Sequence, residues 1–224
     1  MSKIKQALIS VSDKNKLKLI LGILKKFKIK IISSGGTYKE IKRLGYQCKE
    51  VSKFTNSSEL LEGRVKTLHP KIHAGILNKR NNKSHKKQMV LNKYESIDLV
   101  IVNFYPFEKT LKKTKNKKKI IENIDIGGPT LVRSAAKNYI DVTVVTNIDQ
   151  YSDLIDELQK NKGSTSIEFR QKLSEEAFTE TAYYDSVITN YFNSLSKNNL
   201  PKRKLICGNL IEKLRYGENP HQEA

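Results

Sequence analysis

The stretch that decides the fold is D-L-V-I-V-N-F-Y, residues 98–105. Four apolar residues follow Asp98 in an unbroken run, without the alternation of polar and apolar residues that marks a half-exposed strand. Such a run is typical of a central strand in a parallel sheet, because helices cover both faces of that sheet. Pro106 comes next and predicts the end of the strand. We therefore expect a buried parallel strand with helices on both of its sides.

Further strands and helices alternate along the chain around this one. Short apolar runs predict strands at residues 5–11, 29–33, 47–51 and 141–146. Apolar periodicity predicts helices at residues 15–27, 38–44, 83–94, 129–138, 151–160 and 167–195. Repeated strand–helix–strand units predict an α/β fold, in which right-handed crossovers join the strands of a parallel sheet. Residues 196–204 resemble a linker, and the tail from residue 205 begins like a strand.

Residues 52–80 are expected to be mostly loop, and they contain a cationic stretch, L-E-G-R-V-K-T-L-H-P-K-I-H-A-G-I-L (residues 61–77). Its apolar residues follow neither the helical nor the strand period, and Gly63 and Pro70 argue against one continuous element. A loop of this composition suits an anionic ligand. The alternative is a solvated basic loop in a Lys-rich protein.

Polar residues gather at the points where the expected strands end. In an open parallel sheet, ligands bind beyond the carboxyl ends of the strands. The best candidate for a phosphate site is S-G-G-T, residues 34–37, because a helix N-terminus offers free N–H groups and the positive end of its dipole. A plain turn is the alternative, and the motif is neither a dinucleotide fingerprint nor an ATP-binding loop. Together with Tyr105, Asp125 and the cationic loop, it suggests a phosphorylated substrate that undergoes proton transfers.

Composition limits the function classes. The formal net charge is +19, but Lys far outnumbers Arg, and base or phosphate recognition favours Arg, so a nucleic-acid partner is not expected. No apolar run approaches the roughly 18 to 20 residues that span a bilayer, and the apolar stretch near the N-terminus is too short for a signal peptide. We therefore expect a cytoplasmic protein without a membrane partner. Metal is not expected either, because Pro70 separates His69 from His73 and the two cysteines lie far apart.

Six motifs carry a resemblance to a known family: S-V-S-D-K, S-S-G-G-T, E-G-R-V-K-T-L-H-P-K-I-H-A-G-I-L, D-L-V-I-V-N-F-Y-P-F, I-D-I-G-G-P-T-L-V-R-S-A-A-K-N and L-R-Y-G-E-N-P-H-Q. In this order they closely resemble the bifunctional purine-biosynthesis family, whose members combine an IMP cyclohydrolase with an AICAR transformylase. The resemblance assigns residues 1–200 to the cyclohydrolase domain, and residues 201–224 to a linker and the truncated start of the transformylase domain. It implies a methylglyoxal-synthase-like fold: a three-layer α/β/α sandwich on a mainly parallel sheet.

The resemblance also implies the reaction, in which formyl-AICAR (a ribonucleotide 5′-monophosphate) closes its ring to IMP with loss of water, in the last step of purine biosynthesis. The implied partner is this nucleotide, and a homodimer is left open. No metal and no cofactor are implied, because the folate of the family belongs to the missing transformylase domain. Two alternatives are a methylglyoxal-synthase-like enzyme or regulatory domain of the same fold, and a nucleic-acid-binding module.

Site residues follow from the same resemblance. It implies that Lys137 donates or accepts a proton, that Lys66 and Tyr105 lie near the formyl oxygen, and that Asp125 orients or deprotonates the carboxamide. Which Lys acts as base or acid stays open, and His69 and His73 are expected to be structural. The residues implied to bind the substrate are Ser12, Lys14, Ser34, Gly35, Gly36, Thr37, Arg64, Thr67, Asn103, Phe104, Ile126 and Gly127. Arg215 and Tyr216 match the start of the second, transformylase site.

Overall fold

The structure is a computed structural model that describes residues 1–196 and 201–214. The chain divides into two compact units, Met1–Thr181 and Ala182–Ala224, and the boundary falls within the last helix. The main sheet, its covering helices and the candidate site all belong to the first unit. No helix in the described part of the chain is long and apolar enough to cross a membrane.

A five-stranded parallel sheet forms the centre of the first unit, in the order β4-β3-β2-β5-β6. Leu8 of β2 pairs with Ile32 of β3 on one side and with Val100 of β5 on the other. The side chains of the expected central strand, Leu99 to Val102, are all at most 1% exposed. The strands of this sheet are β2 (Gln6–Val11), β3 (Lys30–Ser33), β4 (Lys49–Glu50), β5 (Leu99–Asn103) and β6 (Thr143–Val145).

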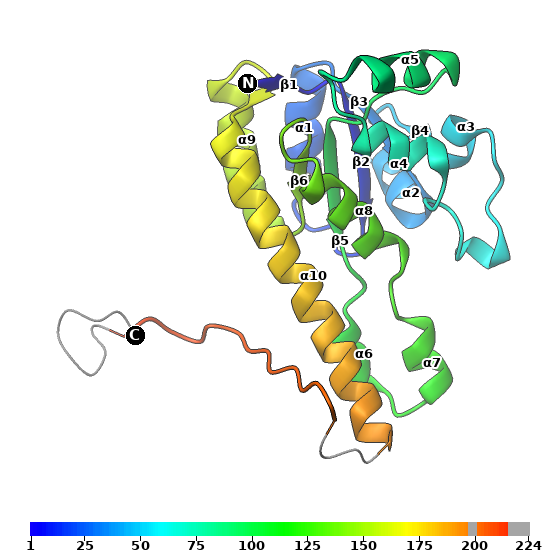
Figure 1. Ribbon diagram of the computed structural model, residues 1–224, viewed down its shortest axis with the longest axis vertical. Helices are drawn as coiled ribbons and strands as arrows, with labels where there is room; N and C mark the ends of the chain where they lie inside the picture. The colour runs from blue at the N-terminus through cyan, green and yellow to red at the C-terminus, as the bar shows by residue number, and fades with distance from the viewer. Residues whose placement is uncertain (197–200, 215–224) are drawn as a thin grey trace. The chain divides into compact units, whose positions relative to one another are not determined.

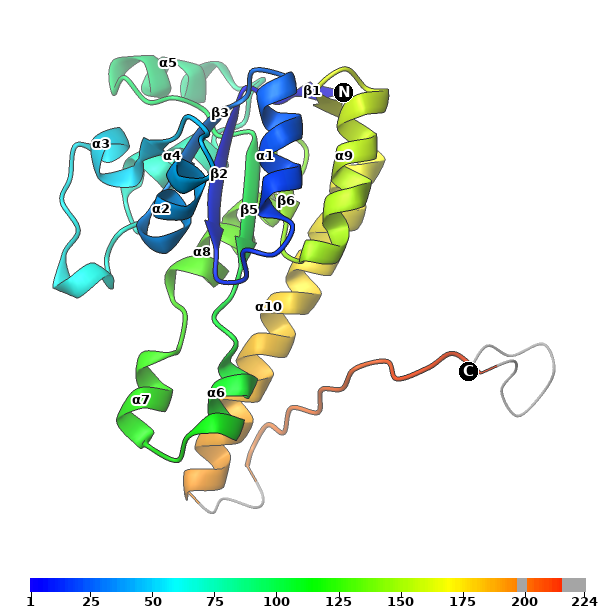
Figure 2. The ribbon, with the colours of Figure 1, turned by 180° about the vertical axis from the view of Figure 1, so that it is seen from behind.

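Helices cover both faces of the sheet, which confirms the expected three-layer α/β/α architecture (Figure 1). Helices α1, α2 and α9 lie on one face, whereas α4 and α8 lie on the other (Figure 2). The helices are α1 (Leu17–Lys26), α2 (Gly35–Arg43), α3 (Val51–Thr55), α4 (Pro70–Leu77), α5 (Lys83–Leu91), α6 (Phe107–Lys113), α7 (Lys117–Glu122), α8 (Gly127–Lys137), α9 (Tyr151–Lys160) and α10 (Ile167–Ser196). Two short 3-10 turns, Leu61–Gly63 and Ile148–Gln150, complete the described helical structure.

A second, two-stranded sheet pairs the N-terminus with a later segment. Strand β1 (Ser2–Lys3) runs antiparallel to β7 (Ser164–Thr165), and the Thr165 hydroxyl lies 2.9 Å from that of Thr143 in β6. Runs of two residues carry no periodic signal, so the sequence did not predict either strand. The small sheet fixes the start of the chain beside the amino end of β2.

The expectation of a loop over residues 52–80 is wrong in two places, because α3 and α4 lie within it. Pro70 does not interrupt a helix here but begins one, at the position where a missing N–H is not needed. Gly75 lies inside α4, where a methyl group would come within 2.8 Å of the carbonyl oxygen of Glu95. Pro70, which argued against a continuous element, and Gly75 therefore both have local reasons to be in this helix.

Two element boundaries and the structure of the tail also differ from expectation. Helix α2 begins at Gly35 rather than at residue 38, so the glycine pair lies in its first turn. The third expected strand shrinks to Lys49–Glu50, because α3 begins at Val51. The tail was expected to begin like a strand, but residues 205–214 form neither helix nor strand.

Candidate functional site

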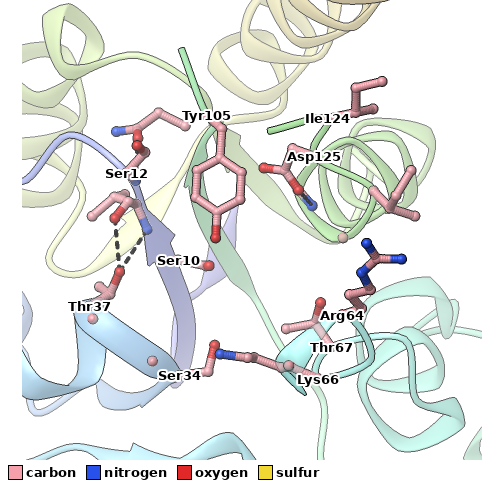
Figure 3. A pocket seen from close by; sticks show the side chains of 18 of the residues that line it. Ser10, Ser12, Ser34, Thr37, Arg64, Lys66, Thr67, Tyr105, Ile124 and Asp125 are labelled. Carbon is pink, nitrogen blue, oxygen red and sulfur yellow. Dashed lines mark hydrogen bonds between the residues drawn. The ribbon is translucent and has the colours of Figure 1, made fainter. Parts of the chain in front are cut away.

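A cavity of about 640 Å³ opens at the carboxyl ends of β2, β3 and β5 (Figure 3). This is where ligands bind in open parallel sheets. Fourteen of the sixteen predicted site residues in the described part of the chain line it. They are Ser12, Lys14, Ser34, Gly35, Gly36, Thr37, Arg64, Lys66, Thr67, Asn103, Tyr105, Asp125, Ile126 and Gly127.

One end of the cavity is the N-terminus of α2. Ser34 caps this helix in an extended conformation, and the N–H groups of the first turn point out of the helix without intrahelical partners. Two ammonium groups flank the glycine pair: a methyl group built on Gly35 would lie 3.3 Å from Lys66 Nζ, and one built on Gly36 would lie 3.8 Å from Lys14 Nζ. The helix dipole, the N–H donors and the two cations together suit an anionic ligand at this end.

Two predicted binding residues use their side chains to hold the cavity wall together. The Thr37 hydroxyl donates to the Val11 carbonyl oxygen at 2.9 Å and accepts from the Val11 N–H at 3.0 Å, as the dashed lines in Figure 3 show. Asn103 Oδ1 accepts from the N–H groups of Ser12 and Asp13, at 2.6 and 2.9 Å. Thr37 and Asn103 therefore fix the loop after β2, and their side-chain polar atoms already have protein partners.

The cationic loop supplies one wall, and the two of its cations that line the cavity point in different directions. Lys66 points towards Ser34, whereas Arg64 points away from it (Figure 3). Lys66 Nζ forms an ion pair with Glu59 Oε2 at 3.1 Å. Arg64 forms a bidentate ion pair with Glu122 of α7, and this contact raises the pKa of the guanidinium. The loop therefore directs Lys66 towards the α2 end of the cavity and Arg64 towards α7.

The opposite end is the N-terminus of α8, where Asp125 lies. The N–H of Gly128 donates to Asp125 Oδ1 at 2.8 Å. Burial raises the pKa of the Asp125 carboxyl above its ordinary value, although backbone hydrogen bonds from Gly128, Tyr105 and Gly127 act in the opposite direction. Tyr105 is half exposed, and its hydroxyl is directed across the cavity towards Ser10 (Figure 3). A carboxyl with a raised pKa beside a phenol suits general acid–base chemistry.

Lys137 and Phe104 are not brought to the cavity. Lys137 ends α8, whereas Gly127 begins it at the cavity, and at about 1.5 Å per residue the helix is roughly 15 Å long. The predicted catalytic role of Lys137 therefore lacks a place in this cavity. Phe104 packs partly buried against the hydrophobic core instead. Arg215 and Tyr216, predicted as the start of a second site, lie outside the described residues.

His69 and His73 serve the packing of α4. Nδ1 of His69 accepts the N–H of Lys71 at 3.1 Å and so caps the helix. Nδ1 of His73 lies 3.1 Å from the Ser134 hydroxyl of α8, and burial lowers the pKa of its imidazole. Neither side chain lines the cavity. Within residues 1–196 and 201–214, no three His, Cys, Asp or Glu side chains converge as a metal site would require.

Comparison with known proteins adds a family to this geometry. The family model of the MGS-like domain matches residues 19–130, half of the chain. The chain belongs to the MGS-like domain family. The matched range contains β3, β4 and β5 and the cavity residues from Ser34 to Gly128, whereas β2 and the cavity residues Ser10 to Lys14 precede it.

A second family model, described as the AICARFT/IMPCHase bienzyme, matches residues 135–224, downstream of the MGS-like domain. Curated relatives extend over nearly the whole chain. The bifunctional purine biosynthesis protein PurH of Bradyrhizobium diazoefficiens is 45% identical over 99% of this chain and 42% of its own length. PurH of Rippkaea orientalis is 48% identical over 97% of this chain and 43% of its own length. The chain thus spans less than half the length of the curated relatives it matches.

A solved structure also resembles the chain. The crystal structure of ForH aligns with a TM-score of 0.75 and 28% sequence identity, and it covers 84% of this chain and 99% of its own. This chain therefore shares the arrangement of its sheet and covering helices with a protein of known structure.

The structure adds cavity residues that the sequence did not single out. Glu62, Gly63, Ile121, Glu122, Ile124 and Gly128 line the cavity as well. Two of them, Ile121 and Glu122, belong to α7, a short helix that begins with three consecutive lysines. The sequence offered one indication that Glu122 lies near the site, because Glu122 precedes Asp125 by only three residues.

Proposed function

We propose that this chain is an IMP cyclohydrolase, which closes the ring of formyl-AICAR to give IMP and water in purine biosynthesis. The observation that carries the proposal is one cavity that suits an anion at the N-terminus of α2 and holds a partly buried carboxyl beside a phenol at the N-terminus of α8. The relatives named PurH support the pathway. A folate-dependent step belongs to the part of those relatives that this chain does not span.

In this proposal the 5′-phosphate binds at the α2 end. The N–H groups of the first turn donate to its oxygens, and the ammonium groups of Lys14 and Lys66 neutralise its charge. The imidazole then extends towards α8, where its carboxamide and formamido groups meet Asp125 and Tyr105. Binding both ends holds the two reacting groups close, and positioning supplies much of the rate in an intramolecular attack.

The ring closure requires two proton movements. The carboxamide nitrogen loses a proton as it attacks the formyl carbon, and the former formyl oxygen gains one. Asp125 is the base that we assign to the first movement, and the Tyr105 hydroxyl donates to the developing oxyanion. The new hydroxyl then takes up a second proton and leaves as water, while the formamido nitrogen gives its proton to the Tyr105 oxygen and so restores the phenol. The Asp125 carboxyl, protonated in the first step, is the acid for this departure.

The direct test adds formyl-AICAR to the 224-residue protein and follows IMP by absorbance. A folded sample that gives no turnover would overturn the proposal. Asp125→Asn is expected to lower kcat by about 100-fold or more, the usual size of a general acid–base contribution. Tyr105→Phe should lower kcat less, because other donors line the cavity. Lys66→Ala should mainly raise KM, since its ammonium lies at the anion end.

Two control variants sharpen this test. His85→Ala changes a partly buried residue of α5 that does not line the cavity, and it should leave turnover unchanged. Lys137→Ala should also retain most of its turnover, because Lys137 ends α8 away from the cavity. If Lys137→Ala loses as much kcat as Asp125→Asn, the assignment of the chemistry to these cavity residues is wrong.

A second candidate follows from the match to the MGS-like domain: a methylglyoxal-synthase-like elimination of phosphate from a small phosphorylated substrate. The anion site would serve this reaction too. Release of inorganic phosphate distinguishes the two reactions, because ring closure of formyl-AICAR leaves the phosphate on the ribose.

A further inference from the structure

Glu59 lies next to a short hairpin that the sequence analysis treated only as a cationic loop. Leu60 and Val65 exchange both backbone hydrogen bonds, at 3.2 and 3.3 Å, and so close a tight antiparallel bridge. Glu59 precedes this bridge and Lys66 follows it, which makes the two residues cross-strand neighbours. Cross-strand neighbours of opposite charge attract each other, and here Lys66 Nζ lies 3.1 Å from Glu59 Oε2.

The turn of the hairpin is shaped so that the Lys66 side chain can cross it. Gly63 has a φ of +90°, and a methyl group at this position would lie 2.3 Å from Lys66 Cε and 2.8 Å from Lys66 Nζ. The same methyl group would lie 3.3 Å from Glu59 Oε2. Because Gly63 has no side chain, the Lys66 side chain can pass over it to reach Glu59.

The far end of Lys66 lies at the anion site. Its ammonium approaches Gly35 in the first turn of α2, and the side chain is 29% exposed, against 67% for Arg64 in the same loop. A free Lys side chain has roughly 2 kcal/mol of rotamer entropy, so it does not keep one position without a partner. In this structure Glu59 and the bare backbone of Gly63 provide the constraint.

We propose that Glu59 is a positioning residue that holds the Lys66 ammonium over the N-terminus of α2, ready for the phosphate of the substrate. The identity of that phosphate rests on the proposed function. Glu59 itself is absent from the cavity lining, so it acts through Lys66 rather than by touching the ligand. The competing idea is that Glu59 occupies Lys66 in the absence of ligand and must be displaced, in which case its removal strengthens binding.

A double-mutant cycle tests the proposal. IMP dissociation constants and kcat/KM are measured for wild type, Glu59→Ala, Lys66→Ala and the double variant. Glu59→Ala should weaken IMP binding and lower kcat/KM by about tenfold, because misplaced groups lose their effect steeply. In the Lys66→Ala background the same substitution should change neither quantity, since Glu59 acts only through Lys66. Additive losses, or tighter IMP binding by Glu59→Ala, would overturn the proposal.

Conservative and matched variants separate positioning from general damage. Glu59→Gln keeps an oxygen acceptor for the ammonium and should restore most of the lost affinity. Gly63→Ala should displace the Lys66 side chain and weaken IMP binding, whereas Gly45→Ala places a methyl group at a similar positive φ of +80° with nothing within 4 Å. Both glycine variants lose some stability, but only Gly63→Ala should lose affinity. Asp153→Ala removes a carboxylate that pairs with Lys172 on the surface, and it should leave IMP binding unchanged.

The role of Glu59 can still be tested if the proposed function fails. A wild-type protein that does not turn over formyl-AICAR refutes the cyclohydrolase assignment, and the cycle is then measured with inorganic phosphate as the probe. Coupling between Glu59 and Lys66 in phosphate binding would still support the positioning role. If the wild type binds neither IMP nor phosphate at this site, both proposals fail.

Discussion

The carboxyl group of Asp125 experiences two opposed effects at the N-terminus of α8. Backbone N–H groups, among them that of Gly128 at 2.8 Å, stabilise its ionised form. Burial in the wall of the cavity destabilises the same form. Burial is the larger effect, since the pKa is raised from its ordinary value of 3.8. A carboxyl in this state is a better proton acceptor for a weak acid than an exposed one.

The raised pKa predicts a stability change at the residue scale. Between pH 3.8 and the folded-state pKa, the folded protein binds more protons at Asp125 than the unfolded chain does, so stability falls as the pH rises through this window. Asp125→Asn removes that cost and should raise the free energy of unfolding at pH 7, while turnover is lost. The gain should disappear below pH 3.8. Urea denaturation at neutral and acidic pH measures it, and a less stable variant at pH 7 contradicts the prediction.

At the scale of elements, one side chain ties the end of β5 to the loop after β2. Asn103 accepts two backbone N–H groups through Oδ1, and its Nδ2 donates to the Asp13 carbonyl oxygen at 3.1 Å. The loop that it holds carries Ser12 and Lys14, both in the cavity wall. A residue predicted to bind substrate is therefore also the clamp between two strand ends.

Asn103→Ala is expected to loosen this clamp. It leaves the N–H groups of Ser12 and Asp13 without their acceptor, which costs about 1 to 3 kcal/mol of stability if water does not replace it. IMP affinity should fall with it, because Lys14 loses its fixed position. Asn92→Ala is the matched control, since the Asn92 amide donates only to the Gln88 carbonyl oxygen on the exposed α5. Equal affinity in wild type and Asn103→Ala would show that the loop keeps its conformation without the clamp.

The whole molecule carries a formal net charge of +19. The proposed substrate is a nucleotide monophosphate with negative charge, and a positive protein field attracts it before contact. Glu59 and Glu122 each pair with a cation of the cationic loop and offset its positive charge. The excess positive charge of the protein therefore comes mainly from the surrounding lysines. We therefore propose that the charge, which did not indicate a nucleic-acid partner, serves substrate capture.

Salt dependence checks this at the scale of the molecule. Raising the ionic strength from about 0.05 to about 0.5 M shortens the Debye length to a few ångströms, and kcat/KM should fall several-fold. The value of kcat should stay nearly constant, because the bound complex is already formed. A kcat/KM that does not respond to salt would show that long-range attraction contributes nothing.

Much of the fold was predictable, because buried parallel strands and amphipathic helices leave periodic signals in the sequence. The polar strand ends then brought most site residues to one edge by topology alone. Helix α4 was missed because Pro70 is a breaker on average but begins a helix here. The position of Lys137 away from the cavity lining could not be predicted, because a motif gives the order of residues and not the length of the helix between them. Glu59 gave no signal, since its pairing with Lys66 depends on a hairpin that only the structure reveals.

The pairing of β1 with β7 has a practical consequence. It anchors the first residues of the chain at the amino ends of the strands, whereas the cavity opens at the carboxyl ends. The six residues of β2 separate the two, a distance of about 20 Å. An affinity handle or a fluorophore attached ahead of Ser2 would therefore report on the protein, or immobilise it on a sensor surface, without obstructing the entrance for a nucleotide.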